Sequence, residues 1–265
     1  MTITLPPHRV WRLEEIVSSI PRSQRRIGVD KWHWVLGYLR SIVLVLPGAR
    51  GIFSQIQEAV CPVKGKRVML STGVHEALVD FRWLAEDVDN RPTRIYELVL
   101  IRPAVYGYHN TSCYMCVTNP SAARPSPNLN GAHPIVWRMP LPKDIVDSLV
   151  SCTNPQRKVN NSELELAGGV VHSDCVAHFF VVTECTVFSR TNNTAGLWWQ
   201  RKSSATCTSS PVHLLRLQAM HQWFHCYVPR IDFVSGVDNL ISDRPSCSSD
   251  LTDNQLLAYL DTNFP

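Results

Sequence analysis

The 265-residue chain has little charge, few glycines and no long apolar run, and each of these absences excludes a class of protein. Charged residues make up only 18% of the sequence, hydrophobic residues 45%, and the net charge is +4. A disordered polyelectrolyte is therefore excluded, and the mild basicity permits contact with a phosphate backbone without predicting it. The most apolar run, Ile42 to Leu46, is five residues long, against about 20 for a membrane span. We therefore expect globular domains without a membrane partner.

Several motifs are also missing. The sequence has no Gly-x-Ser-x-Gly elbow, no glycine-rich phosphate loop and no Asp-Asp pair typical of a polymerase palm, so those enzyme classes are not predicted. Nine cysteines are present, but the number is odd and the N-terminus has no apolar stretch of signal-peptide length. We interpret them as reduced thiols in an intracellular protein, cytoplasmic or nuclear.

Two textures follow one another along the chain. Apolar residues recur at three- and four-residue steps over 30–46, 52–60 and 72–87, which predicts helices there. Short β-type runs follow over 95–101, 104–108, 114–118 and 134–139, then a helix over 161–178, a strand over 179–188, helices over 193–201 and 211–227, and a strand over 230–234. The loop over 119–133 is predicted to be an exposed insertion, and residues 256–260 could form a final short helix. This order predicts an α/β fold with one mixed sheet.

Five segments resemble, in order, the connection and ribonuclease H region of retrotransposon reverse transcriptases of the kind found in fungi and oomycetes. They are Lys31-Trp32 with 36–41 and 46–51, Arg91 to Arg94 with 97–99, Asn161 to Ala167, Leu214 to Arg216, and Gly236 to Asn239 with 242–246. The resemblance implies a helical connection segment over 1–92, a ribonuclease H-like domain over 93–245 with a mixed five-stranded sheet and flanking helices, and a tail over 246–265. It also implies a polymerase domain upstream, outside this chain, and an RNA–DNA hybrid as partner.

The same resemblance implies an active site of four carboxylates holding two Mg²⁺ ions, because paired hard cations need clustered oxygen ligands. The family's glutamate falls on Glu165 and its last aspartate on Asp243, which we expect to be the metal ligands. The first-strand aspartate falls on Asn110 and the aspartate after the fourth strand falls on Asn192. An amide lacks the negative charge that offsets two cations. The resemblance therefore predicts an ancestral hybrid nuclease that is inactive here.

Trp198, Trp199, Arg201 and Lys202 form an aromatic and basic cluster that could stack on a base or contact phosphate. The alternative is that one tryptophan packs the helix onto the sheet and the cations are solvated. Arg216 could face a hybrid duplex or the interdomain surface. Cys113-x-x-Cys116 and the pair His221 and His225 have metal-ligand spacing, but neither has the further ligands that a zinc site needs.

Three functions remain open. The first is an active hybrid nuclease with Glu165, Asp243 and Asp238 binding magnesium. The second is an inactive module that binds nucleic acid. The third is a retroelement remnant or an interaction protein that uses the fold as a scaffold.

Overall fold

The computed structural model describes residues 2–46, 48–60, 65–90, 92–97, 99, 103–110, 114–119, 124–125, 135–152, 155–205, 209–240, 242 and 251–263. The chain divides into two compact units. The helical unit comprises Met1–Leu100 with Lys202–Val228, and the sheet unit comprises Ile101–Arg201 with Pro229–Pro265. Each unit is a group of residues that pack compactly with one another. The predicted domain limits at residues 92 and 245 concern ancestry, and they stay a prediction.

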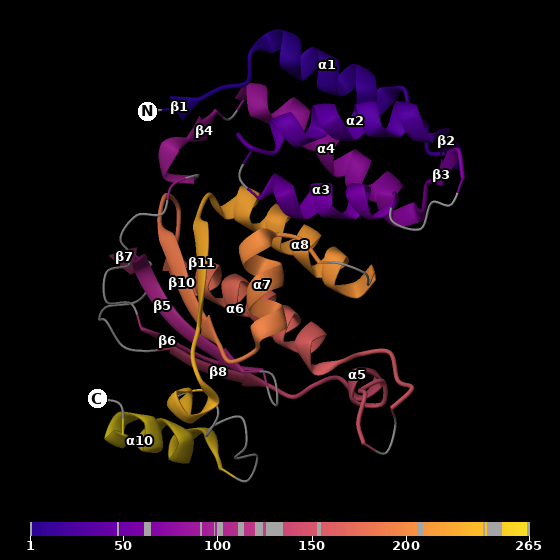
Figure 1. The fold of residues 1–265 in the computed structure, drawn as a ribbon. Helices are drawn as coiled ribbons and strands as arrows, with labels where there is room; N and C mark the ends of the chain where they lie inside the picture. The colour runs from indigo at the N-terminus through magenta and orange to yellow at the C-terminus, as the bar shows by residue number, and fades with distance from the viewer. Residues whose placement is uncertain are drawn as a thin grey trace. The chain divides into compact units, whose positions relative to one another are not determined.

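Over its described residues, the helical unit contains the α-helices α1 Pro7–Ser18, α2 Val29–Ile42, α3 Ala49–Glu58, α4 Thr72–Asn90 and α8 Ser209–His225 (Figure 1). The unit also contains two short antiparallel strand pairs. β1 (Thr2–Ile3) pairs with β4 (Thr93–Arg94), and β2 (Arg26–Gly28) pairs with β3 (Arg67–Met69). The apolar stripes of these helices form one continuous core, which includes the fully buried Trp32, Phe81 and Trp223. Helical periodicity in the sequence arises from this burial.

Helix α8 packs against α3 at glycine, which lets the two backbones approach closely. A Cβ atom added to Gly51 would lie 2.4 Å from the Leu215 carbonyl oxygen. Gly48 has φ +72°, a left-handed conformation that favours glycine. The Trp223 indole donates a 2.7 Å hydrogen bond to Asp87 of α4. This places α8 firmly within the helical unit.

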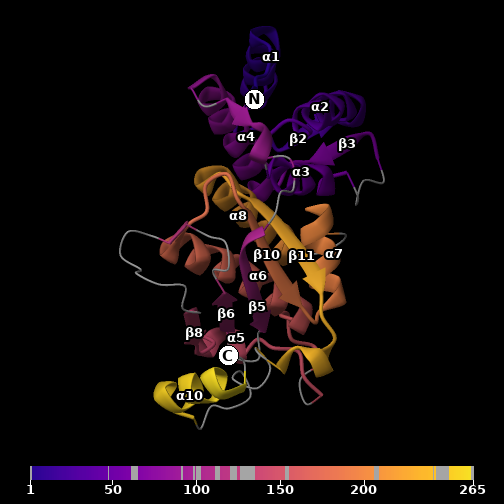
Figure 2. The same ribbon diagram turned by 90° about the vertical axis from the view of Figure 1, so that its left-hand side faces the viewer.

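The sheet unit contains a five-stranded mixed sheet in the order β11-β10-β5-β6-β8 (Figure 2). The strands are β5 Pro103–Asn110, β6 Tyr114–Asn119, β8 Ile135–Met139, β10 Thr186–Thr191 and β11 Val228–Phe233. β5, β6 and β8 pair antiparallel, and β10 runs parallel to β5. The remaining elements are β7 Arg124–Pro125, which pairs with β9 Phe180–Val181, and α5 Lys143–Val146, α6 Asn161–Phe179, α7 Thr194–Lys202, η2 Gly236–Asp238 and α10 Asp253–Asn263. The structure confirms the predicted α/β fold class, because it contains both α-helices and a mixed β-sheet.

Two predicted strands are wrong. Residues Ile95–Glu97 form a short 3₁₀ helix (η1) instead of a strand, because the buried Glu97 carboxylate turns back to accept a 3.1 Å hydrogen bond from the Arg94 N–H. The predicted strand over 179–188 is divided: α6 continues through Phe179, and Glu184 turns the chain with φ 62° before β10 begins. Most of the predicted loop over 119–133 lies outside the described residues.

The last helix, α10, docks on the edge strand β8 (Figure 2). Leu256 and Leu260 are buried against Val136. Arg138 of β8 donates a 2.8 Å hydrogen bond to the Leu251 carbonyl and forms a 2.8 Å ion pair with Asp253. The C-terminal segment therefore belongs to the sheet unit, and the predicted short helix there is confirmed.

Candidate functional site

The candidate site lies where two parallel strands of the sheet unit end. β5 ends at Asn110 and β10 ends at Thr191. Their register pairs Tyr108 with Arg190, so continuing it by two residues brings Asn110 level with Asn192. Because the carboxyl ends of parallel strands lie at the same sheet edge, the two predicted amides come from neighbouring positions. Asn110 is buried and Asn192 is half-buried.

Helix α6 brings Glu165 to this edge. Its first turn is fixed by a capping box, in which Asn160 Oδ1 accepts a 3.0 Å bond from the Glu163 N–H and the Glu163 carboxylate accepts a 2.9 Å bond from the Asn160 N–H. Glu165 follows half a turn later and is 3% exposed. Asparagine three residues before glutamate is a sequence signal for such a cap, and sequence reasoning overlooked it.

Glu165 contacts the residues directly before the two amides. His109 Nδ1 lies 3.9 Å from Glu165 Oε2, and Thr191 Oγ1 donates a 3.5 Å hydrogen bond to the same oxygen. Thr191 and His109 are both buried. The carboxylate therefore contacts one polar group from the end of each of the two strands.

Two buried histidines extend this cluster. The rings of His109 and His172 lie 5.8 Å apart, and both residues are 1% exposed. Burial lowers the pKa of His109 to about 4, and burial together with His109 lowers the pKa of His172 to about 3. Both rings are therefore neutral at pH 7.

Gly107 of β5 makes the histidine pair possible. A Cβ atom there would lie 2.2 Å from His172 Cε1, so any side chain would displace the ring. A glycine inside a strand is a known sign of close approach by another element. That signal was available in the sequence, although its partner His172 was not, because His172 lies 65 residues further along the chain.

The described contacts of Glu165 supply no second carboxylate for a pair of magnesium ions. α6 brings the Glu165 carboxylate to this edge, and two of its contacts, the His109 imidazole and the Thr191 hydroxyl, are uncharged. No group of three or more His, Cys, Asp or Glu residues in the described part of the chain could hold a metal ion. Asp243 lies outside the described residues. Asp238, in η2, accepts a 2.6 Å hydrogen bond from Ser235 at the surface.

The predicted aromatic and basic cluster lies on α7. This helix is capped by Asn193, whose Oδ1 accepts a 2.8 Å bond from the Gly196 N–H. Trp198 is 49% exposed and Trp199 is half-buried. The Arg201 guanidinium lies 5.9 Å from the Trp198 ring, donates to the Ile231 carbonyl at 2.8 Å, and pairs with Asp232. Lys202 is exposed.

Arg216, the other predicted nucleic-acid contact, is bound within the helical unit. Its guanidinium forms a bidentate pair with Asp80 and a 2.8 Å pair with Glu76, both on α4. The hydrogen bond to Asp80 raises the pKa of Arg216. The Arg216 guanidinium therefore joins α8 to α4, and it is not part of the surface that we propose for nucleic acid.

Two further pairs in the sequence have metal-ligand spacing. The His221 and His225 rings have centroids 4.3 Å apart and are tilted, and His221 Nδ1 lies 3.0 Å from the Tyr227 hydroxyl. Cys116 is on β6, whereas Cys113 lies outside the described residues.

Comparison with known proteins gives a loose structural likeness. No family model matches the chain, and no curated protein matches it. Foamy viral protease-reverse transcriptase in complex with RNA/DNA hybrid is 10% identical, with a TM-score of 0.26 over 84% of this chain and 26% of that chain. A second structure, foamy viral protease-reverse transcriptase dRH in complex with double-stranded DNA, is 12% identical to the present chain, with a TM-score of 0.27. The match covers 88% of the present chain and 35% of the viral chain. The chain thus spans about a quarter to a third of the length of these two structures.

None of the helices in the described ranges combines the length and hydrophobicity of a membrane span.

Proposed function

We propose that the sheet unit is a ribonuclease H-like domain of reverse transcriptase ancestry that no longer cleaves RNA–DNA hybrids and acts by binding nucleic acid. The strand order supports this proposal. Three consecutive strands pair antiparallel, and a helix then leads to a fourth strand that runs parallel to the first. This is the arrangement that the family's carboxylate site requires, with ligands on the first strand, the following helix and the end of the fourth strand.

The position of Glu165 is the observation that carries the proposal. The family's glutamate would have to meet the ends of the first and fourth strands, and Glu165 contacts His109 at the end of β5 and Thr191 at the end of β10. Asn110 and Asn192 directly follow these two residues. This placement supports the proposal that the two amides stand where the family has aspartates, which would leave the site with less negative charge.

Electrostatics explains why such a site would not cleave. Two divalent cations about 3.5–4 Å apart repel each other strongly and are held by several carboxylates in two-metal enzymes. Here the groups around Glu165 are an imidazole kept neutral by burial and a hydroxyl, followed by two amides. We therefore expect the site to offset too little of the four positive charges of two divalent ions.

The face of α7 is the surface that we propose for nucleic acid. Trp198 exposes half of its indole, and its neighbour Arg201 is held in place by Asp232 and the Ile231 carbonyl. A preorganised indole beside a guanidinium can stack on an unpaired base or rest against a ribose-phosphate backbone. Lys202 adds an exposed cation at the end of the same helix.

The test is a fluorescence titration of a labelled RNA–DNA hybrid at several salt concentrations. We expect binding that weakens as salt rises, because neutralised phosphates release counterions. Loss of one stacking contact is worth about 1–3 kcal/mol, so Trp198→Ala is expected to weaken binding roughly 5- to 150-fold. Trp11→Ala is the matched control, because Trp11 is a 68% exposed tryptophan on α1.

Equal affinities for the two variants would refute the assignment of α7. A complete absence of salt-dependent binding would instead favour the second candidate function, in which the fold serves as a scaffold for protein interaction.

A further inference from the structure

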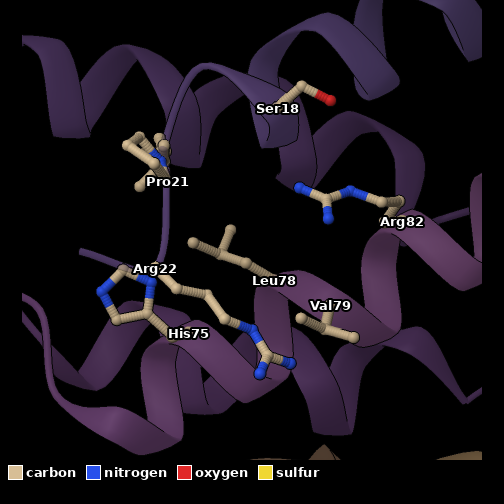
Figure 3. Close-up of a pocket in the computed structure, with 8 residues that line it drawn as sticks. Ser18, Pro21, Arg22, His75, Leu78, Val79 and Arg82 are labelled. Carbon is tan, nitrogen blue, oxygen red and sulfur yellow. The ribbon is translucent and has the colours of Figure 1, made fainter. Parts of the chain in front are cut away.

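The helical unit contains a cavity of about 500 Å³ that the proposed function does not use. It is lined by Ser18, Ile20, Pro21, Arg22, His75, Leu78, Val79 and Arg82 (Figure 3). The first four residues come from the end of α1 and the turn after it, and the other four come from α4. The cavity therefore depends on how α1 packs against α4.

Its walls combine an apolar floor with basic groups. In this view the Leu78 side chain lies between the Arg82 and Arg22 side chains, and the Arg82 guanidinium lies beneath Ser18 (Figure 3). The Arg22 side chain runs along the other side of Leu78 (Figure 3). His75 is 8% exposed, and its Nε2 lies 2.9 Å from the Gln24 carbonyl oxygen. Because a carbonyl only accepts hydrogen bonds, this contact fixes Nε2 as a donor.

The two arginines are not neutralised within the described part of the chain. Neither Arg22 nor Arg82 forms an ion pair or hydrogen bond with another described residue, and none of the residues lining the cavity is acidic. The Nε atom of Arg82 is buried without a hydrogen-bond partner among them. Arg216, in the same unit, pairs with two carboxylates. The positive charges of the Arg22 and Arg82 guanidinium groups are therefore not offset by the residues lining the cavity, and they can attract an anionic ligand.

We propose that this cavity binds a phosphate monoester that carries an apolar or ring-bearing group. A phosphomonoester brings a charge of about −1.5 to −2 and three acceptor oxygens, which matches the two guanidinium charges and the additional Ser18 hydroxyl. Guanidinium groups bind phosphate oxygens with paired hydrogen bonds. Leu78, Val79 and Ile20 would contact the apolar part of the ligand. The phosphate could belong to a free small molecule or to the end of a nucleic-acid strand, and the cavity's chemistry is the same for both.

Calorimetric titration of the full chain with phenyl phosphate tests this proposal. We expect saturable binding that is tighter than for inorganic phosphate, because the ring buries apolar surface. Loss of one charge-assisted hydrogen bond is expected to weaken binding about tenfold or more in Arg82→Gln and in Arg22→Gln. The matched control is Arg25→Gln, which removes the same charge from an exposed residue of the same turn that does not line the cavity.

A 5′-phosphorylated oligonucleotide and its unphosphorylated twin then separate the two sources. Competition by the phosphorylated strand alone would identify a strand end as a ligand, and no competition by either would identify a free small molecule. Absence of saturable phenyl phosphate binding would overturn the proposal, as would equal weakening by Arg25→Gln. Because Arg22 is exposed, Arg22→Gln keeps the test decisive if Arg82→Gln fails to fold. The outcome is independent of hybrid binding by α7.

Discussion

Replacing Gly51 by alanine sets two physical effects of opposite sign against each other. Gly51 lies in the first turns of α3, where alanine is intrinsically favoured over glycine by about 1 kcal/mol. The added Cβ would, however, lie 2.4 Å from the Leu215 carbonyl oxygen of α8, where ordinary contact begins at 3.4 Å. Helix α8 would therefore have to move by about 1 Å.

The packing cost should exceed the gain in helix propensity. Overpacking of a well-packed contact costs typically about 1–3 kcal/mol. The Leu215 oxygen is backbone, so it cannot rotate away, and the Ala219 Cβ at 3.1 Å closes the other side. We expect Gly51→Ala to destabilise the helical unit by about 1–2 kcal/mol, combining these two effects.

Gly37→Ala is the matched control. Gly37 is exposed in the middle of α2, and an added Cβ there would meet nothing within 4 Å. The same chemical change should therefore stabilise by about 0.5–1 kcal/mol. Hydrogen exchange of the slowest amides in the helical unit measures both effects without assuming that the two units unfold together. Equal stabilisation by Gly51→Ala and Gly37→Ala would refute the close contact between α3 and α8.

Two further predictions concern buried charge. Because burial lowers the pKa of His109 to about 4 and that of His172 to about 3, the unfolded chain binds protons below pH ~6.5 that the folded chain does not. Stability is full above this pH and should fall by about 1.4 kcal/mol per histidine per pH unit as the pH drops toward 4; equal urea midpoints for the sheet unit at pH 5 and 7.5 would contradict this. Arg216→Met leaves the Asp80 carboxylate, 12% exposed, without its partner, and should cost the helical unit about 3 kcal/mol by hydrogen exchange. A loss below about 1 kcal/mol would show that the pair behaves like a surface ion pair.

The sequence predicted the elements whose burial is periodic. Helices were predicted over 30–46, 52–60 and 72–87, and the structure has α2, α3 and α4 within a few residues of these limits. Val35, Leu39 and Ile42 are buried on one face of α2, and this burial is the source of the three- and four-residue steps. Most strands of the sheet were found for the analogous reason that β-branched and aromatic residues favour a pleated surface.

Elements decided by one hydrogen bond or by the backbone conformation of one residue were not predicted. Glu97 turns the chain after β4 into a 3₁₀ helix through its own hydrogen bond, although the local sequence is typical of a strand. Glu184 adopts a left-handed conformation that glycine usually provides, so the turn before β10 has no composition signal.

In the candidate site, too, some features could be predicted from the sequence and others could not. The resemblance directed attention to Glu165, whereas its contacts with His109 and Thr191 depend on the register of β5 against β10 and on the docking of α6. The histidine pair depends on Gly107, whose importance is visible only when its partner is known. The assignment of Asn110 and Asn192 to the family's aspartates stays a prediction.

Cleavage of a labelled RNA–DNA hybrid by the variant Asn110→Asp plus Asn192→Asp tests the central claim most directly. The assay is run with magnesium and then manganese, beside the native chain and the same variant carrying Glu165→Ala. We predict that the native chain is silent, that the double variant cuts, and that Glu165→Ala abolishes the restored activity. Cleavage by the native chain that Glu165→Ala leaves untouched would contradict the account.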